Sequence, residues 1–227
     1  MFAELSTICN SGKEYRDRLP LGFGTSQMTS SSIQPKRVVR AFYFDIGGVL
    51  IEDKFGRDAR KALLEIAQMQ DGDPGAAFAA YTEMQPYLDS GRASLSDFCT
   101  AARLRQAEFE KAWLAAHPVD SAVLQVIERL LENGERVGLA TNFCRQLLDL
   151  LISRNPVLDR LLICCSSDFG FVKPSREFFQ RAEEIIDTSK VIFVDDRTIN
   201  IQAARAIGWT AIGATGDWLR EFSGVYL

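Results

Sequence analysis

One stretch decides the fold, Val38-Val39-Arg40-Ala41-Phe42-Tyr43-Phe44-Asp45-Ile46-Gly47-Gly48. Its β-branched and aromatic residues predict a buried strand. The strand is expected to stop at Asp45, because Gly47 and Gly48 follow at once and favour a tight turn. A carboxylate at the junction of a buried strand and a loop is therefore the first candidate functional group.

Short apolar runs recur along the chain and alternate with helical patterns. Further strands are expected at residues 136–140, 161–165, 191–194 and 210–212. Helices are expected at residues 122–132, 145–153, 176–186 and 199–207. Strands that alternate with helices of this length predict an α/β fold in which a parallel sheet carries helices on both faces.

Residues 54–118 interrupt this alternation, because they show helical periodicity only. Ala62, Leu63 and Ile66 lie at the spacing of one helix face, and Ser94-x-x-Asp97 is the pattern of a capping box. We therefore expect a small all-helical cap domain inserted after the first strand.

The chain of 227 residues is long enough for one core of ordinary size with a small inserted module. The core is expected to comprise residues 38–53 and 119–227, on either side of the insert. Residues 1–37 are rich in Ser, Thr and Gly and show no sustained period, so they predict a flexible N-terminal extension.

Charge and cysteine content narrow the class of protein. The 26 Lys plus Arg and 30 Asp plus Glu give a net charge of −4, which does not predict a nucleic-acid partner. No apolar run reaches the roughly 18 residues of a membrane helix, so no membrane partner is expected. The five cysteines lack C-x-x-C spacing and favour a reducing, cytoplasmic location; Cys164 and Cys165 are interpreted as buried strand residues.

The chain contains one histidine, His117. A zinc site built on several histidines is therefore excluded. A serine-histidine triad would have to use His117, which precedes Pro118 and is expected at an exposed helix end. Carboxylates and hydroxyls are left to carry the chemistry.

Polar side chains follow the predicted strands, where the carboxyl ends of parallel strands form ligand sites. An aspartate can act as a nucleophile, threonine and lysine can hold a phosphoryl group, and clustered carboxylates suit Mg²⁺. In strand order these residues are Asp45, then Thr141 and Asn142, then Asp168 and Lys173, then Asp195 and Asp196.

Each of these residues also has a purely structural interpretation. Asp45 before two glycines is a common turn former, and Thr141-Asn142 can cap the following helix. Lys173 can be a solvated loop lysine. The pair Asp195-Asp196 can cap a helix N-terminus. It is their joint occurrence at successive strand ends that favours a phosphate and metal site.

Four segments in order resemble the motifs of the haloacid dehalogenase (HAD) superfamily of hydrolases. They are residues 44–50, 139–142, 173–174 and 194–200. The resemblance extends over about residues 40–215. It implies a Rossmann-like core and a helical cap between the first and second motifs.

The resemblance implies roles for the residues that match the motifs. Asp45 is expected to be the nucleophile that forms an aspartyl-phosphate. Thr141 and Asn142, with neighbouring backbone N–H groups, are expected to bind the phosphoryl oxygens. Lys173 is expected to bind the same group and to balance its charge.

The resemblance also implies a Mg²⁺ site. Its expected ligands are the Asp45 carboxylate, the backbone carbonyl of Gly47 and the Asp196 carboxylate, with Asp195 as a further acid. Asn200 stands where the family usually has an acid that orients this cluster, and its amide oxygen can accept a hydrogen bond.

Gly47 departs from the family pattern, because HAD phosphatases usually carry a second aspartate there as the general acid and base. Losing such a group costs about 100- to 10,000-fold in rate. The loss matters least where the leaving group is already stable as an anion, or where a cap residue or a bound water supplies the proton. The resemblance therefore implies a magnesium-dependent phosphatase for a small phosphorylated metabolite. The hypothesis from Gly47 is that it favours an easily expelled leaving group, such as a sugar 1-phosphate or an acyl phosphate.

Three other functions remain open from the sequence. A non-catalytic phosphate-binding or regulatory protein would keep the fold and the metal site. A dehalogenase also lacks the second aspartate, but it needs no magnesium, which the pair Asp195-Asp196 disfavours. A phosphonate hydrolase would need a cap lysine, for which Lys54 and Lys61 are available.

Substrate choice is expected to rest with the cap, which closes over such sites. The cap residues considered for this role are Arg57, Arg60, Tyr81, Tyr87 and Arg92.

Overall fold

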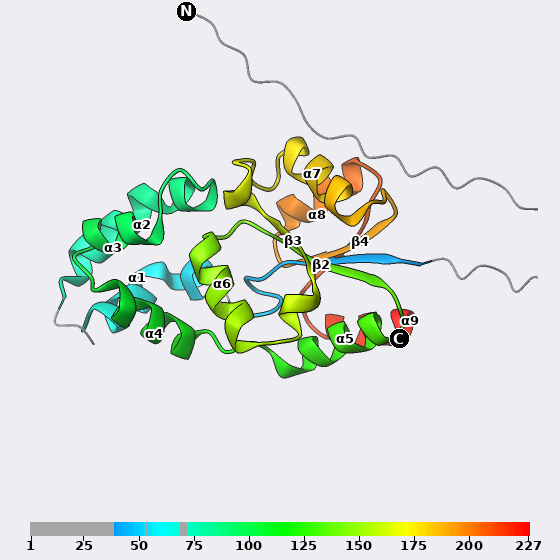
Figure 1. The fold of residues 1–227 in the computed structure, drawn as a ribbon, viewed down its shortest axis with the longest axis horizontal. Coiled ribbons are helices and arrows are strands. Elements are labelled where there is room, and N and C mark those ends of the chain that lie inside the picture. The colour runs from blue at the N-terminus through cyan, green and yellow to red at the C-terminus, as the bar shows by residue number, and fades with distance from the viewer. Residues whose placement is uncertain (1–38, 53, 69–71) are drawn as a thin grey trace, which may run out of the picture. The chain divides into compact units, whose positions relative to one another are not determined.

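The computed structural model describes residues 39–52, 54–68 and 72–227 (Figure 1). For residues 54–60 it describes the helix but not the side chains. The expected N-terminal extension and Val38 lie outside the described residues. Within them, five strands form one sheet in the order β3-β2-β1-β4-β5, and every neighbouring pair is parallel. The strands are β1 Ala41–Phe44, β2 Arg136–Thr141, β3 Leu162–Cys165, β4 Val191–Asp195 and β5 Thr210–Gly213. The predicted parallel sheet is confirmed.

Helices cover both faces of the sheet, as expected for an α/β fold (Figure 1). They are α5 Ser121–Glu132, α6 Arg145–Arg154, α7 Arg176–Ile186, α8 Thr198–Ala206 and α9 Trp218–Tyr226. The first four match the predicted helices with small shifts at their ends. Helix α9 was not predicted. Helices α5 and α9 lie on one side of the sheet and α7 and α8 on the other.

The alternation of side chains along β1 explains why both faces are covered. Phe42 points to one face, where its ring meets Phe222 of α9 at 5.8 Å between centroids. Tyr43 points to the other face, where it stacks on Trp209 at 6.0 Å and donates from its hydroxyl to the Ala182 carbonyl at 3.0 Å. All four residues of β1 are buried, so the strand that leads into Asp45 is held rigidly.

A helical insertion follows β1, as the sequence predicts. It contains α1 Lys54–Gln68, α2 Pro74–Asp89, α3 Leu95–Ala101 and α4 Gln106–Ala116. The predicted capping box at the start of α3 is present: Ser94 Oγ accepts from the Asp97 N–H at 3.1 Å, and Asp97 accepts from the Ser94 N–H at 2.8 Å.

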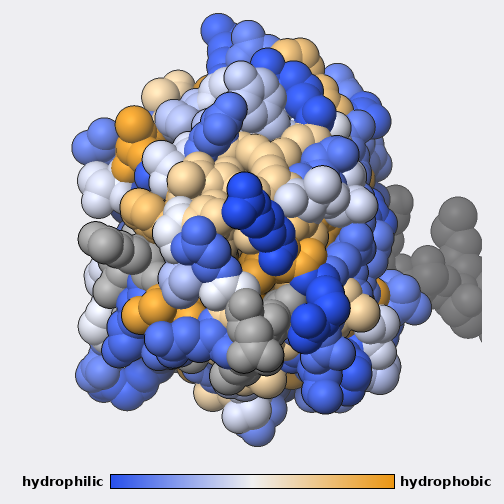
Figure 2. Space-filling model, turned by 90° about the vertical axis from the view of Figure 1, so that its left-hand side faces the viewer, coloured by the Kyte–Doolittle hydropathy of each residue, from blue (hydrophilic) through white to orange (hydrophobic). Residues whose placement is uncertain are grey.

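The insertion leaves and rejoins the core at one place. Ile51 and Val119 form an antiparallel bridge, and the Asp120 N–H donates to the Leu50 carbonyl at 2.8 Å. Figure 2 shows the end of the molecule that carries the insertion, where hydrophobic side chains form small groups among hydrophilic ones. None of the helices in the described part of the chain is long and apolar enough to cross a membrane.

The four cysteines among the described residues are unpaired and buried, and Cys164 and Cys165 lie on β3 as predicted. Burial raises the pKa of Cys99 and of Cys164 to about 12 and that of Cys165 to about 11. Because the thiolate is the reactive form, we expect these three to resist iodoacetamide at pH 8 in the folded protein. Peptide mass spectrometry measures this, with urea-unfolded protein as the fully labelled control. Rapid labelling of the folded protein would contradict the expectation.

Candidate active site

Asp45 lies directly after β1, in the turn that leads to the insertion. Its carboxylate oxygen Oδ1 accepts a hydrogen bond from the Ile46 N–H at 2.7 Å. The residue is only 7% exposed. Gly47 bridges to Ile51, and the Gly48 N–H donates to the Ile51 carbonyl at 2.8 Å, so the turn folds back on itself. The turn thereby fixes the direction of the Asp45 carboxylate.

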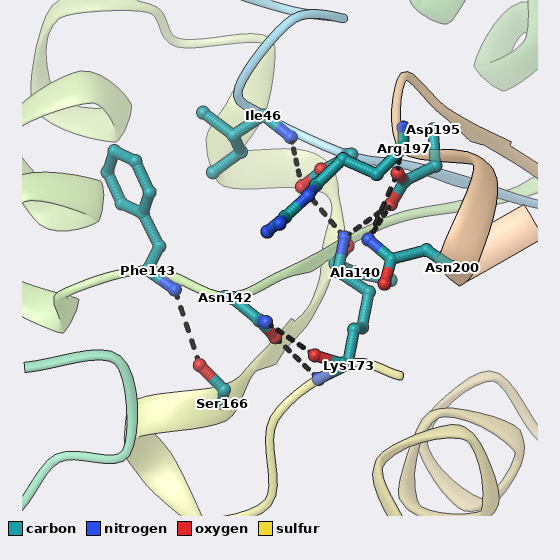
Figure 3. A network of polar contacts seen from close by, with 10 residues as sticks. Ile46, Ala140, Asn142, Phe143, Ser166, Lys173, Asp195, Arg197 and Asn200 are labelled. Carbon is teal, nitrogen blue, oxygen red and sulfur yellow. Dashed lines mark hydrogen bonds and ion pairs between the residues drawn. The ribbon is translucent and has the colours of Figure 1, made fainter. Parts of the chain in front are cut away.

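Lys173 is the central cation of the site (Figure 3). Its Nζ lies 2.9 Å from Asp45 Oδ1 and 2.7 Å from Asp195 Oδ2, and it donates to the Ala140 carbonyl at 2.8 Å. Three acceptors thus surround an ammonium that has three N–H donors. Its side chain is 1% exposed, so the interpretation as a solvated loop lysine is wrong.

Asn142 fixes the backbone of Lys173. Its Nδ2 donates to the Lys173 carbonyl at 2.9 Å, and its Oδ1 accepts from the Lys173 N–H at 2.7 Å. The side chain after β2 therefore pairs with the loop after β3 by two bonds, as Figure 3 shows. A role in capping the following helix is not what the geometry favours for Asn142.

The charges of this group depend on one another. Burial raises the pKa of Asp45 to about 7, Lys173 opposes the rise, and Asp195 adds to it. At Lys173, burial favours the neutral amine, but the charges of Asp45 and Asp195 outweigh it and raise its pKa. The ammonium therefore stays charged. A divalent cation beside Asp45 would lower the pKa of this carboxyl by its own charge.

Asp195 is fully buried, and the neighbouring residues engage both of its oxygens. Besides Lys173, the Arg197 N–H donates to Oδ1 at 2.8 Å, and Asn200 Nδ2 lies 3.1 Å from both oxygens. Asn200 thus donates through its amide nitrogen, whereas the sequence suggested that it accepts. The reason is that its partner is a carboxylate, which only accepts. Asp195 anchors Lys173 rather than facing the cavity.

Asp45, Asp195 and Asp196 place carboxylate oxygens within 4.8 Å of one another. Asp196 packs directly against the turn after β1: a Cβ added at Gly48 would lie 2.3 Å from Asp196 Oδ2. Gly48 has φ +72°, a conformation that glycine adopts without strain. Carboxylate oxygens at this spacing suit Mg²⁺, which prefers oxygen ligands.

A cavity of about 490 Å³ opens beside these groups. The sheet edge contributes the predicted site residues Asp45, Gly47, Thr141, Asn142, Lys173, Asp196 and Asn200. The insertion contributes aromatic side chains, Phe98, Phe109 and Trp113, and Trp113 meets Phe143 of the core edge to edge at 5.7 Å. The structure therefore brings the predicted site residues together under the insertion, with Asp195 just behind the cavity wall.

Several expectations for other residues are corrected. Asp168 does not reach the cavity, because its carboxylate pairs with Arg145 at 2.8 Å. Of the insertion residues considered for substrate choice, Tyr81 lines the cavity. Tyr87 and Arg92 do not line it: the Arg92 guanidinium lies over the Tyr87 ring, 4.8 Å from its centroid. The side chains of Arg57 and Arg60 lie outside the described residues.

His117 ends α4 as predicted, but the expectation that it is exposed is wrong. It is 2% exposed and lines the cavity. Its ring stacks on Trp113 at 4.6 Å, and its Nδ1 lies 2.8 Å from the Trp113 carbonyl. The spacing of four residues between the two rings was the available signal, because it places them on one helix face.

Some residues of the cavity were not predicted from the sequence. Gln85 and Asp89 line it from the insertion, and Glu52 and Arg197 line it from the core. Helical periodicity does not show which polar residues of α2 face the core. Arg197 directly follows Asp195 and Asp196, so its position in the chain was the signal for it.

Comparisons with solved structures show the same fold in other proteins. A HAD family enzyme from Bacteroides thetaiotaomicron aligns with a TM-score of 0.64 and 19% identity, over 82% of this chain and 99% of that chain. The complex of that enzyme with magnesium and inorganic phosphate aligns with a TM-score of 0.62 and 18% identity, over 82% of this chain and 100% of that chain. L-2-haloacid dehalogenase from Xanthobacter autotrophicus, with chloropropionic acid covalently bound, aligns with a TM-score of 0.53 and 15% identity. The alignment covers 77% of this chain and 76% of that chain.

At the level of sequence, no match is found among the curated proteins. The model of one family does match, that of the haloacid dehalogenase-like hydrolases, over residues 39–208. This segment is most of the chain and holds the whole site described above. The chain therefore belongs to the haloacid dehalogenase-like hydrolases.

Proposed function

We propose that this hydrolase is a magnesium-dependent phosphatase that cleaves a small phosphorylated metabolite through an aspartyl-phosphate. The observation that carries the proposal is the pairing of Lys173 with both Asp45 and Asp195 beside the cavity. Asp196 belongs to the same carboxylate cluster. A buried carboxylate paired with a buried lysine matches a nucleophile whose charge must be held until the phosphoryl group arrives.

In the first step, an Asp45 carboxylate oxygen attacks phosphorus, the bond from phosphorus to the leaving oxygen breaks, and the electron pair stays on that oxygen. Thr141 and the backbone N–H groups beside Asn142 are proposed to hold the phosphoryl oxygens, and Lys173 offsets their charge. In the second step, water attacks phosphorus, the bond from phosphorus to the Asp45 oxygen breaks, and its electron pair returns to the carboxylate. The proton that the water loses passes to the released phosphate. This is acyl-phosphate chemistry on a side chain.

Asp45, the Gly47 carbonyl and Asp196 are the groups proposed to hold Mg²⁺, and Asp195 supports them through Lys173. The donor set fits the ion, because the three carboxylates approach within 4.8 Å and all offer oxygen. When bound, Mg²⁺ neutralises charge on the transferring phosphoryl group. Magnesium and inorganic phosphate are bound together in the Bacteroides thetaiotaomicron enzyme of the same fold, which supports this assignment.

Residues 54–118 are proposed to act as a cap over the site, and residues 38–53 and 119–227 as the catalytic core. The cavity is lined from both parts, which supports this division. A cap of this kind would exclude water and contact the leaving group.

Gly47 places no acid beside the leaving oxygen, so we expect a substrate whose leaving group departs readily, such as a sugar 1-phosphate or an acyl phosphate. The absence of a side chain at Gly47 leaves the backbone carbonyl in place. Metal binding is therefore expected to be retained while proton transfer from this position is lost.

Dehalogenation is the second candidate, because a dehalogenase with chloropropionic acid covalently bound shares the fold. The carboxylate cluster favours the phosphatase, since attack on a carbon centre needs no metal. A Schiff-base phosphonate hydrolase has less support: Lys61 is exposed and does not line the cavity, and the side chain of Lys54 lies outside the described residues.

The decisive experiment compares wild type with Asp45→Asn on a panel of phosphorylated metabolites, with Mg²⁺ or with a chelator. We expect phosphate release by wild type with Mg²⁺ only, and a loss of at least about 10,000-fold in Asp45→Asn. Asp159→Asn, an exposed aspartate in the turn before β3, is the matched control and is expected to keep full activity.

If wild type releases no phosphate from any ester, the protein is instead a phosphate-binding or regulatory member of the family. Chloride release from 2-chloropropionate without Mg²⁺ would favour the dehalogenase.

A further inference from the structure

We propose that Arg197 contacts the leaving group and stabilises the negative charge that forms on its oxygen, taking over part of the task left open at Gly47. This inference rests on the proposed phosphatase function. Arg197 is the first residue after the pair Asp195-Asp196 and precedes α8. Neither its position in the motif nor the expected magnesium site assigns a role to its side chain.

The backbone of Arg197 is fixed at the site. Its N–H donates to Asp195 Oδ1 at 2.8 Å, and its carbonyl accepts from the N–H groups of Asn200 and Ile201 at 3.0 and 3.1 Å. The side chain therefore starts from a rigid point beside the carboxylate cluster. A long side chain on a fixed backbone loses less freedom when it binds a ligand.

The side chain lines the same cavity as Asp45 and Gly47. In the view of Figure 3, it runs from the start of α8 and its guanidinium lies between Lys173 and Phe143. Phe143 also lines the cavity, where its ring contacts Trp113 of the insertion. Arg197 therefore lines the cavity together with the carboxylate cluster, and in the proposal its guanidinium meets the departing group there.

The charges of the cavity show why this cation matters. Within the described lining, acidic side chains outnumber basic ones: Asp45, Glu52, Asp89 and Asp196 against Lys173 and Arg197. Lys173 is committed to Asp45, Asp195 and the Ala140 carbonyl. No partner for the Arg197 guanidinium occurs among residues 39–52, 61–68 and 72–227. Its donors remain available to a ligand.

Charge on the leaving oxygen grows as its bond to phosphorus breaks, and no acid at Gly47 removes it. A guanidinium cannot act as the acid, because it stays protonated in proteins. It can donate hydrogen bonds to the oxyanion, which leaves with its electron pair and takes a proton from water afterwards. Stabilisation of this kind acts most strongly where charge develops most.

The test uses a series of aryl phosphates from phenyl phosphate to 2,4-dinitrophenyl phosphate, with Mg²⁺. In Arg197→Gln, kcat/KM is expected to fall about 100-fold on phenyl phosphate, as for loss of one oxyanion donor, and by about tenfold or less on the dinitrophenyl ester. The dependence of rate on leaving-group pKa therefore becomes steeper. Arg197→Lys is expected to lie between Arg197→Gln and wild type, since it keeps the charge but loses the fork of donors.

Arg160→Gln is the control, because Arg160 is exposed before the edge strand β3 and does not line the cavity. Calorimetry is expected to give the same Mg²⁺ affinity for Arg197→Gln and wild type, and urea unfolding the same stability. An equal loss across the ester series overturns this inference while the phosphatase stands. A wild-type protein that hydrolyses neither these esters nor any phosphorylated metabolite overturns both.

Discussion

Lys173→Met is expected to lower the free energy of unfolding by about 3–5 kcal/mol, because it removes the cation from a buried charge cluster. Asp45 and Asp195 would remain as two carboxylates, with side chains 10% and 0% exposed and no counter-charge between them. Methionine keeps the length of the stem, so the loss reflects charge and not volume. Urea unfolding in the absence of Mg²⁺ measures it.

Two further variants show that the loss comes from unpaired charge. Lys190→Met removes an exposed lysine before β4 and is expected to change stability by about 0.5 kcal/mol at most. The double variant Lys173→Met with Asp195→Asn is expected to regain part of the stability, because one buried charge is removed with the lysine. If Lys173→Met unfolds at the same urea concentration as wild type, the cluster does not hold the fold as described.

Gly48→Ala is expected to weaken Mg²⁺ binding by about 10- to 100-fold, the effect typical of disturbing the surroundings of a ligand. A Cβ at this position would lie 2.3, 2.5 and 2.9 Å from Oδ2, Cγ and Cβ of Asp196, so the whole side chain must move. The positive φ adds a backbone cost of about 1–3 kcal/mol. Calorimetric titration with Mg²⁺ separates the first effect from the second.

Gly216→Ala is the matched control for this variant. Gly216 also has a positive φ, +60°, but a Cβ there has no atom within 4 Å. We expect it to lose stability and to bind Mg²⁺ as wild type does. Equal Mg²⁺ affinity in both variants would show that Asp196 does not need the close approach to Gly48.

The core elements could be predicted because their signals are local. The run that leads into Asp45 is apolar on both faces, which is the pattern of a central parallel strand. Helix α9 was not predicted because its apolar pattern is short. It is held by the packing of Phe222 on Phe42, two residues far apart in the sequence. Long-range contacts of this kind leave no periodic trace in sequence.

The strand-end residues of the site could be predicted from the sequence, but not which neighbours each side chain faces. Strand ends bring Asp45, Lys173 and Asp195 together, and sequence order is enough to expect it. That Asp195 faces Lys173 while Asp196 faces Gly48 depends on which way two adjacent side chains point. Likewise, the burial of His117 depends on how α4 packs against the core, which its own residues do not state.

The two hydrogen bonds between Asn142 and the backbone of Lys173 resemble the pair that two strand residues exchange. The last pair of β2 and β3 is Thr141 with Cys165. The Asn142 side chain adds one further pair of hydrogen bonds beyond it, with an amide group in place of the strand backbone. The loop between β3 and Lys173 is therefore held at both ends, at Cys165 by the sheet and at Lys173 by Asn142. Surface loops generally accept insertions, so a residue added between Cys165 and Lys173 is expected to bulge outward while Asn142 keeps the ammonium between both carboxylates.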